Sequence, residues 1–289
     1  MLVSLLLWSN FATSLALYTH EVIELLDGYV GSLRKNDTVA TCLNGAPKSK
    51  KPLSELNLQF VDDLVGQRNW IITSMVSTER REATMILSRY ALLLTSEGDF
   101  VETGVWHGGT SALMIKTLLE FDPCSRKFYA FDSFEGLPPP TIEDTKGESR
   151  VGKAGNYAAT QEIYEGNLKK MGVWDDKIIR VAKGWFKTTC PISPVEKISF
   201  LRLDGDLFAS TWDAISALYH KVVPGGLIYV DDYGSFNGCR QAIDKFRSVH
   251  KIWEPLHLIR EKTEKSGVGP MTFEAVWWVK SARHQHHEM

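Results

Sequence analysis

Short apolar runs alternate with segments of helical periodicity over the C-terminal two thirds of the chain. Runs that are apolar at nearly every position are typical of strands buried on both faces of a parallel sheet. They lie at 99–104, 127–132, 177–182, 198–204 and 226–231. The gaps between the runs leave room for crossover helices near 110–121, 158–171, 209–221 and 237–249. This alternation predicts an α/β fold built on a doubly wound, mostly parallel sheet.

The end of the chain carries two further strand-like runs, at 255–260 and 272–280. Between them lies a short polar segment that contains Gly267 and Gly269. Glycine in a short connection between two strands favours a hairpin. We therefore expect a seven-stranded sheet with an antiparallel edge. Ligands of such sheets bind beyond the carboxyl ends of the strands, so the strand ends are the place to look for chemistry.

The first hundred residues have a different pattern. Apolar residues recur at helical spacing from 17 to 33 and again from 79 to 95, with an aperiodic stretch at 36–54 between them. We expect residues 17–97 to form a helical appendage or lid, before a sheet domain at 98–282 and a frayed tail at 283–289. The apolar stripes of the two helices lack a partner within this segment, which favours a homo-oligomer.

Residues 1–16 are apolar and uncharged but too short to span a bilayer. They are a signal peptide without the usual positive start, or a packed N-terminal helix. No later stretch has the length of a membrane span. Four widely spaced cysteines without a CxxC motif favour free thiols in a reducing compartment. We therefore expect a cytoplasmic protein, with a secretory or organellar location as the alternative.

Composition narrows the class of partner. The chain has 289 residues, of which 44% are hydrophobic and 24% charged, and this is typical of a folded globular protein. Its formal net charge is −2. Nucleic-acid binding proteins usually carry a basic excess or stripe, which is missing here. A small molecule is therefore the expected partner, and nucleic acid is not.

Each of the first two predicted strands ends in an acid. Glu102-Thr103-Gly104 ends the first, and Asp132-Ser133 ends the second. An acid after the second strand is placed to accept hydrogen bonds from ribose hydroxyls. A carboxylate in the first loop disfavours pyrophosphate, which binds bare N–H groups, and suits a ligand with a cationic part. Together the loops predict a site for an adenosine that carries an amino acid, although each alone also fits a tight turn or helix cap.

The fourth and fifth predicted strands end in four aspartates. Asp204 and Asp206 follow one strand, and Asp231 and Asp232 follow the next. Carboxylates that converge from adjacent strand ends repel one another unless a cation neutralises them. Hard oxygen ligands select Mg²⁺, or Mn²⁺ or Ca²⁺, over zinc. The spacing predicts a divalent-cation site, with Asp206 beside the cation as a candidate base.

Five blocks along the chain resemble the macrocin O-methyltransferase family, in the family's order. They are FVETGVWHGGTSALM, AFDSFEGLP, GWFKTTCP, LRLDGDLFASTWDAISALY and PGGLIYVDDYGSFNGCRQAIDKFR. The resemblance covers about residues 17–280. It implies the class I methyltransferase fold and a metal-dependent enzyme that transfers a methyl group from S-adenosylmethionine to a sugar hydroxyl.

The resemblance also implies roles for individual residues. Around the donor, Glu102, Thr103 and Gly104 would line the methionine end, Asp132 and Ser133 would hold the ribose, and Gly184 and Trp185 would lie beside the adenine. In the acidic loops, Asp204, Asp231 and Asp232 match the magnesium ligands, and Asp206 matches the general base.

One departure concerns the acceptor. Macrolide-sugar members of the family use a histidine after the DSFEG block, but this chain has no histidine between His107 and His220. The segment 141–157, which would belong to a lid over the acceptor, also differs throughout. We therefore expect an O-methyltransferase that acts on a small hydroxylated acceptor, either a sugar or another vicinal diol. The sequence does not identify the acceptor.

Three other classes use parts of the same pattern. An NAD-linked or nucleotide-sugar oxidoreductase would need a glycine fingerprint without Glu102. A metal-dependent phosphoesterase would use the aspartates but leaves the first two loops unexplained. A non-catalytic protein that binds a nucleoside-type ligand is the remaining alternative.

Overall fold

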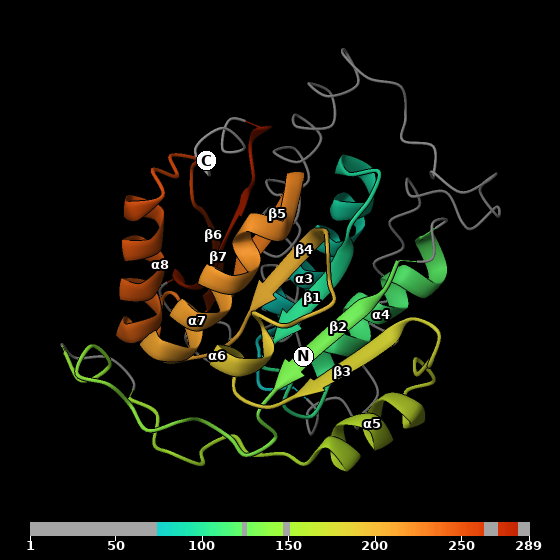
Figure 1. Ribbon diagram of the computed structural model, residues 1–289, viewed down its shortest axis with the longest axis horizontal. Coiled ribbons are helices and arrows are strands. Elements are labelled where there is room, and N and C mark those ends of the chain that lie inside the picture. The colour runs from blue at the N-terminus through green and yellow to red at the C-terminus, as the bar shows by residue number, and fades with distance from the viewer. Residues whose placement is uncertain (1–73, 123–125, 147–150, 263–270, 283–289) are drawn as a thin grey trace, which may run out of the picture.

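The computed structural model describes residues 74–122, 126–146, 151–262 and 271–282. Within these ranges, one seven-stranded sheet runs through the molecule in the order β3-β2-β1-β4-β5-β7-β6 (Figure 1). The strands are β1 (Asp99–Thr103), β2 (Phe128–Asp132), β3 (Ile179–Lys183), β4 (Ile198–Leu203), β5 (Val222–Val230), β6 (His257–Lys262) and β7 (Met271–Val279). β1 to β5 pair in parallel, whereas β7 pairs antiparallel with both β5 and β6. The predicted α/β sheet with its antiparallel edge is confirmed.

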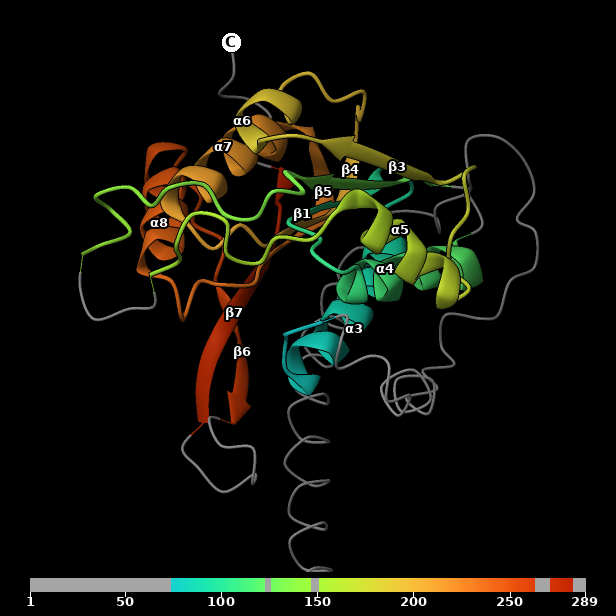
Figure 2. The same ribbon diagram turned by 90° about the horizontal axis from the view of Figure 1, so that it is seen from below.

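Helices cover both faces of the sheet (Figure 2). On one face lie α3 (Thr78–Leu94), α4 (Gly109–Phe121) and α5 (Gln161–Lys170). On the other lie α6 (Phe186–Thr189), α7 (Phe208–Leu218) and α8 (Asn237–Val249). The near-continuous apolar strands suit this arrangement, because alternate side chains of a strand point to opposite faces.

The last strand shows this alternation directly. Trp277 packs into the hydrophobic cluster on the α3–α4 side, and its neighbour Trp278 packs into the cluster on the α7–α8 side. Both side chains are completely buried. Together these two clusters form the core and hold the carboxyl ends of β1, β2, β4 and β5 at one edge of the molecule.

Helix α3 is part of this core, whereas the sequence analysis assigned it to an appendage. Ala83, Ile86 and Leu87 are at most 2% exposed and belong to the same cluster as β1 and β4 side chains. Four of its five charged residues are buried as well, namely Arg80, Arg81, Glu82 and Arg89. Ser77 caps the helix by accepting a hydrogen bond from the backbone N–H of Arg80 at 3.2 Å.

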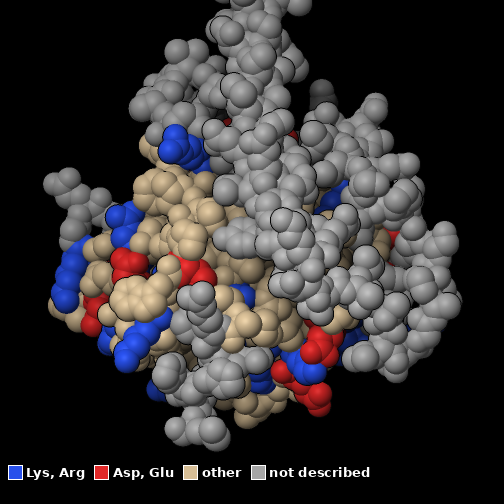
Figure 3. All heavy atoms as spheres, turned by 90° about the horizontal axis from the view of Figure 1, so that it is seen from above, with Lys and Arg blue, Asp and Glu red and all other residues tan. Residues whose placement is uncertain are grey.

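Several expectations fall outside the described residues. These are the apolar segment 1–16, the helix at 17–33, the loop at 36–54 and the tail at 283–289, so self-association through the first helix stays a prediction. Within the described residues, no helix has both the length and the apolar character that crossing a membrane requires. Cys190 and Cys239 are buried free thiols. Acidic and basic side chains of the described residues are interspersed on the face shown in Figure 3.

Candidate active site

A cavity of about 340 Å³ opens at the carboxyl ends of the parallel strands. Loops after β1, β2, β4 and β5 form most of it, and the segment before α3 closes one side. Its lining includes Gly104, Trp106, Asp132, Ser133, Trp185, Asp204, Asp206, Asp231 and Asp232. Most of the strand-end residues that the sequence singled out therefore meet in one place, whereas Glu102, Thr103 and Gly184 are not part of this lining.

Glu102 lies beneath this cavity rather than on its wall. Its carboxylate is completely buried and accepts hydrogen bonds from Thr110 at 2.6 Å and from Ser111, both in the first turn of α4. It also pairs with Arg202 at 2.9 Å. Burial raises the pKa of Glu102, and the charge of Arg202 opposes that rise. Glu102 thus fixes the start of α4 under the first loop, and Thr103 beside it is also fully buried.

Gly104 brings the first loop against the fourth strand end. Its φ is +83°, and a Cβ built there would lie 1.7 Å from the carbonyl oxygen of Asp204. Glycine is the residue that combines this left-handed conformation with such a close approach. The loop after β1 and the loop after β4 are therefore in direct contact.

Asp132 ties the first two loops together at the cavity. Its Oδ2 accepts backbone N–H groups from Val105 at 2.8 Å and Trp106 at 3.1 Å. Its Oδ1 accepts the N–H of Phe134 at 2.7 Å. The backbone N–H of Gly184 donates to the Asp132 carbonyl at 2.8 Å and so places the next loop alongside.

The rim of the cavity next to this loop is aromatic. Trp185 follows Gly184 directly, is 39% exposed and lines the cavity. Ser133 also lines it, and its hydroxyl donates to the Gly136 carbonyl at 2.8 Å. A carboxylate beside a partly exposed indole forms a surface on which a nucleoside can both hydrogen-bond and stack.

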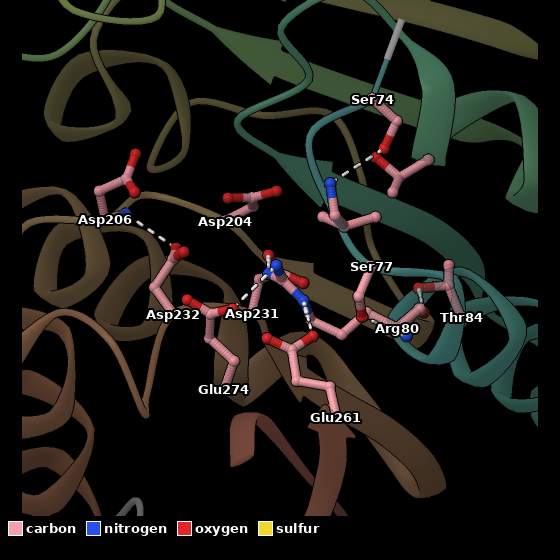
Figure 4. A network of polar contacts seen from close by, with 12 residues as sticks. Ser74, Ser77, Arg80, Thr84, Asp204, Asp206, Asp231, Asp232, Glu261 and Glu274 are labelled. Carbon is pink, nitrogen blue, oxygen red and sulfur yellow. Dashed lines mark hydrogen bonds and ion pairs between the residues drawn. The ribbon is translucent and has the colours of Figure 1, made fainter. Parts of the chain in front are cut away.

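Three aspartates of the cavity lining lie close to one another (Figure 4). One carboxylate oxygen from each of Asp204, Asp206 and Asp232 lies within 4.8 Å of the others. The backbone N–H of Asp206 donates to Asp232 at 3.1 Å. Asp206 has a left-handed backbone, with φ +55°, which is uncommon for a residue with a side chain. We call these residues the aspartate triad.

The protonation of the triad reflects its crowding. Burial raises the pKa of Asp204 to about 6, against the opposing charge of Arg202. Burial and then repulsion from Asp206 and Asp204 raise the pKa of Asp232 well above its usual value. Desolvated carboxylates that lie close together repel one another, and a hard divalent cation that binds to their oxygens removes this repulsion. The residues present therefore fit such an ion.

Asp231 lines the same cavity but is not one of the three residues of the triad, and its role as a metal ligand stays a prediction. Its carboxylate pairs with Arg80 at 2.5 Å and with Arg202 at 2.8 Å, and it accepts a hydrogen bond from Tyr229 at 2.9 Å. Burial alone would raise the pKa of Asp231, but the two arginines hold it below its usual value. Asp206, which the sequence placed beside the cation, occupies the third position in the cluster instead.

Arg202 is a buried residue next to the site that the sequence analysis did not single out. It is completely buried on β4 and pairs with Glu102, with Asp204 at 2.6 Å and with Asp231. The sequence did contain a sign of it, because an arginine inside an otherwise apolar strand needs buried acidic partners. Arg202 therefore connects Glu102, under the loop after β1, to Asp204 and Asp231 in the cavity lining.

Comparison with known proteins supports a relationship over most of the described chain. Residues 70–264 match the model of the macrocin-O-methyltransferase (TylF) family. Demethyldecarbamoylnovobiocin O-methyltransferase from Streptomyces niveus is 36% identical over 162 residues, which are 55% of this chain and 62% of that protein. The chain thus matches about three fifths of that relative's length.

Two further comparisons agree. The 8-demethyl-8-(2,3-dimethoxy-alpha-L-rhamnosyl)-tetracenomycin-C 4'-O-methyltransferase from Streptomyces olivaceus is 34% identical over 194 residues, which are 65% of this chain and 74% of that protein. The solved structure of the O-methyltransferase NovP superposes with a TM-score of 0.64 at 26% identity. The superposition covers 80% of this chain and 100% of NovP.

Proposed function

The chain belongs to the macrocin O-methyltransferase family, and on that premise we propose that it transfers a methyl group from S-adenosylmethionine to a hydroxyl of a sugar or another vicinal diol, with the help of a divalent cation. One observation carries the proposal. A single cavity joins a nucleoside-type surface at Asp132 and Trp185 to the aspartate triad. The relatives named above, both O-methyltransferases, support the same reaction.

On this proposal the donor lies along the first three loops. Gly104 has no side chain, so the methionine end of the donor can approach the backbone there. Glu102 and Thr103 lie beneath this loop and support it. A carboxylate has about four lone-pair sites, and Asp132 uses three of them for backbone N–H groups. The remaining one is available to a ribose hydroxyl, with Ser133 beside it. Trp185, positioned by Gly184, offers its exposed ring to the adenine.

The cation would be held by Asp204, Asp206 and Asp232. Support for Asp204 and Asp232 comes both from the family resemblance and from their closeness to each other, and Asp206 supplies the third carboxylate of the group. A divalent cation there supplies Lewis acidity, which lowers the pKa of an acceptor hydroxyl.

The chain's own groups orient the acceptor and remove its proton. Methyl transfer is an in-line displacement, in which the bond from carbon to the acceptor oxygen forms as the bond to sulfur breaks, so alignment of the two substrates decides the rate. Asp206 lines the cavity. A carboxylate has two oxygens, so Asp206 can face the triad with one and accept the hydroxyl proton with the other.

Calorimetry and a turnover assay together test this function. S-adenosylmethionine is titrated into the full chain with and without Mg²⁺, and methyl transfer is then measured on vicinal diols and on matched acceptors in which one hydroxyl is replaced by hydrogen. We expect donor binding in both titrations and Mg²⁺-dependent transfer to the diols only. Absence of donor binding overturns the proposal, and binding without transfer to any diol favours a non-catalytic binding protein.

A pH-dependent stabilisation by Mg²⁺ follows from the raised pKa values. The pKa of Asp204 is raised above its unfolded value, so the folded protein without a cation loses stability as the pH rises through about 6. A cation restores that stability but has to compete with protons at lower pH. We expect Mg²⁺ to raise the Tm by a few degrees at about pH 7.5 and by clearly less at about pH 5.5.

Thermal unfolding with Mg²⁺, against KCl at the same ionic strength, measures this difference. An equal rise in Tm at both pH values would show that the cation binds somewhere other than the triad.

A further inference from the structure

Asp144 is a buried carboxylate in an irregular segment of the chain after β2. The segment 138–146 contains no helix or strand and lies beside α7 and α8 (Figures 1 and 2). Asp144 is only 3% exposed. A charged group taken out of water needs hydrogen-bond partners, because its desolvation is costly. The partners of Asp144 therefore show how the segment is attached to the rest of the molecule.

The two oxygens of Asp144 contact two different parts of the chain. Oδ1 accepts the backbone N–H of Phe208, the first residue of α7, at 2.7 Å. The N–H groups in the first turn of a helix have no partner within the helix, and Leu207, which precedes α7, has no polar side chain to offer them. Oδ2 accepts both the N–H and the hydroxyl of Thr141, at 2.7 and 2.9 Å. Asp144 thus caps α7 and shapes the turn at 141–144.

Two side chains of α8 attach the segment as well. The amides of Gln241 and Asn237 donate to the backbone carbonyls of residues 143 and 146, at 2.9 and 2.5 Å. Neither hydrogen bond involves Asp144, so both remain when Asp144 is replaced. They hold the end of the segment that lies away from the cavity. The turn that leads toward the cavity is tied to α7 through Thr141 and Asp144.

The segment and the start of α7 both adjoin the cavity. Pro138, at the start of the segment, lines it, and so does Asp206, which lies two residues before α7 begins. The neighbouring Leu137 also lines the cavity but is held separately, by backbone hydrogen bonds of 2.9 Å with residues 155–156. Asp144 therefore joins a wall of the cavity to the helix that follows the candidate base.

Building on the proposed function, we propose that Asp144 is a positioning residue, which holds Pro138 against the acceptor and fixes the start of α7 behind Asp206. Asp144→Ala removes three hydrogen bonds at once and leaves the N–H of Phe208 without its cap. The turn at Thr141 loses its tie to α7, so the wall at 138–141 and the helix start both loosen. The acceptor should then bind less tightly and react more slowly.

Steady-state kinetics of the full chain on a vicinal-diol acceptor, well below the Tm of every variant, test this role. We expect Asp144→Ala to raise the KM for the acceptor about tenfold and to lower kcat about threefold, with a Kd for S-adenosylmethionine within about twofold of wild type. Asp144→Asn keeps an oxygen for the N–H of Phe208 but loses the bond from the N–H of Thr141. Its KM should lie between those of the wild type and Asp144→Ala.

Thr160→Ala is the matched control for the loss of a helix cap. Thr160 caps α5 by accepting the N–H of Ile163 at 3.3 Å, and it lies outside the cavity lining. This variant should lower the Tm but leave KM and kcat at their wild-type values. A purely stabilising role of Asp144 would give the same result as Thr160→Ala.

Hydrogen–deuterium exchange locates the change without depending on turnover. We expect faster exchange in Asp144→Ala at 141–144 and at Phe208, and wild-type exchange at these positions in Thr160→Ala. Wild-type exchange there in Asp144→Ala would overturn the proposal even if KM rose, because the effect would then arise elsewhere.

The kinetic outcomes separate this proposal from the proposed function. Wild-type protein that transfers methyl groups, together with an Asp144→Ala variant of unchanged KM and kcat, overturns the role of Asp144 alone. Wild-type protein that transfers no methyl group to any diol overturns the proposed function and the role of Asp144 with it. If Asp144→Ala does not fold, Asp144→Asn decides: a raised KM with faster exchange at 141–144 supports the role, and wild-type values overturn it.

Discussion

Asp232→Asn is expected to lower the rate of methyl transfer about a thousandfold, equivalent to about 4 kcal/mol of transition-state stabilisation. Asp232 is the most deeply buried member of the triad and one of the three carboxylates of the proposed cation site. Asparagine keeps the shape and can still accept the N–H of Asp206, so the loop should stay in place. The substitution therefore removes the negative charge of the side chain and leaves its size and its hydrogen bond almost unchanged.

Single-turnover kinetics and donor titration separate this effect from a loss of folding. The Kd for S-adenosylmethionine should stay within about threefold of wild type, since Asp132 and Trp185 are untouched. Asp244→Asn is the control, because Asp244 accepts a hydrogen bond from Tyr233 outside the cavity lining. A variant at position 232 with the wild-type rate would remove the triad from the reaction.

Arg202→Met is expected to have the largest effect on stability, a fall of about 3–5 kcal/mol in the free energy of unfolding. Methionine fills much of the same volume, but Glu102, Asp204 and Asp231 then share a buried site without this cation. The loss of the contact between the guanidinium and the Tyr229 ring, 5.2 Å away, adds to the effect.

Urea denaturation of the wild-type and variant proteins measures the change. Adding Glu102→Gln to Arg202→Met should recover part of the loss, because one of the unpaired charges is removed. Arg180→Met is the matched control, since Arg180 also lies on a strand but is exposed, and it should change stability by less than about 0.5 kcal/mol. A similar loss in both variants would mean that the buried ion pairs of Arg202 contribute nothing specific.

The sheet was predictable because its strands are apolar on both faces. The helices that cover it were also found from periodicity, with one misjudgement. The apolar periodicity of residues 79–95 favoured an amphipathic helix in an appendage, whereas the structure packs α3 into the core and buries Arg80 and Arg89 as well. Arg89 lies over the Phe121 ring at 4.3 Å, and Arg80 has its three acidic partners. Such distant partners cannot be read from the spacing within one helix.

The gathering of aspartates at one edge was also predictable, since the carboxyl ends of adjacent parallel strands meet there. The direction of each side chain was not. Asp231 and Asp232 are consecutive and lie in a bend after the end of β5, where the alternation of side chains along a strand no longer applies. The sequence pattern therefore does not tell which of them neighbours Asp204 and Asp206. Which one depends on Arg80 and Arg202, whose positions only the folded chain provides.

The contact between Gly104 and the Asp204 carbonyl restricts how this protein can be redesigned. No side chain fits at position 104, so a library that randomises it should return glycine alone among the variants that fold. The loop after β1 and the loop after β4 meet at this contact. Attempts to broaden the range of donors or acceptors therefore have more scope at the rim, where Met75 and Trp185 are partly open to solvent.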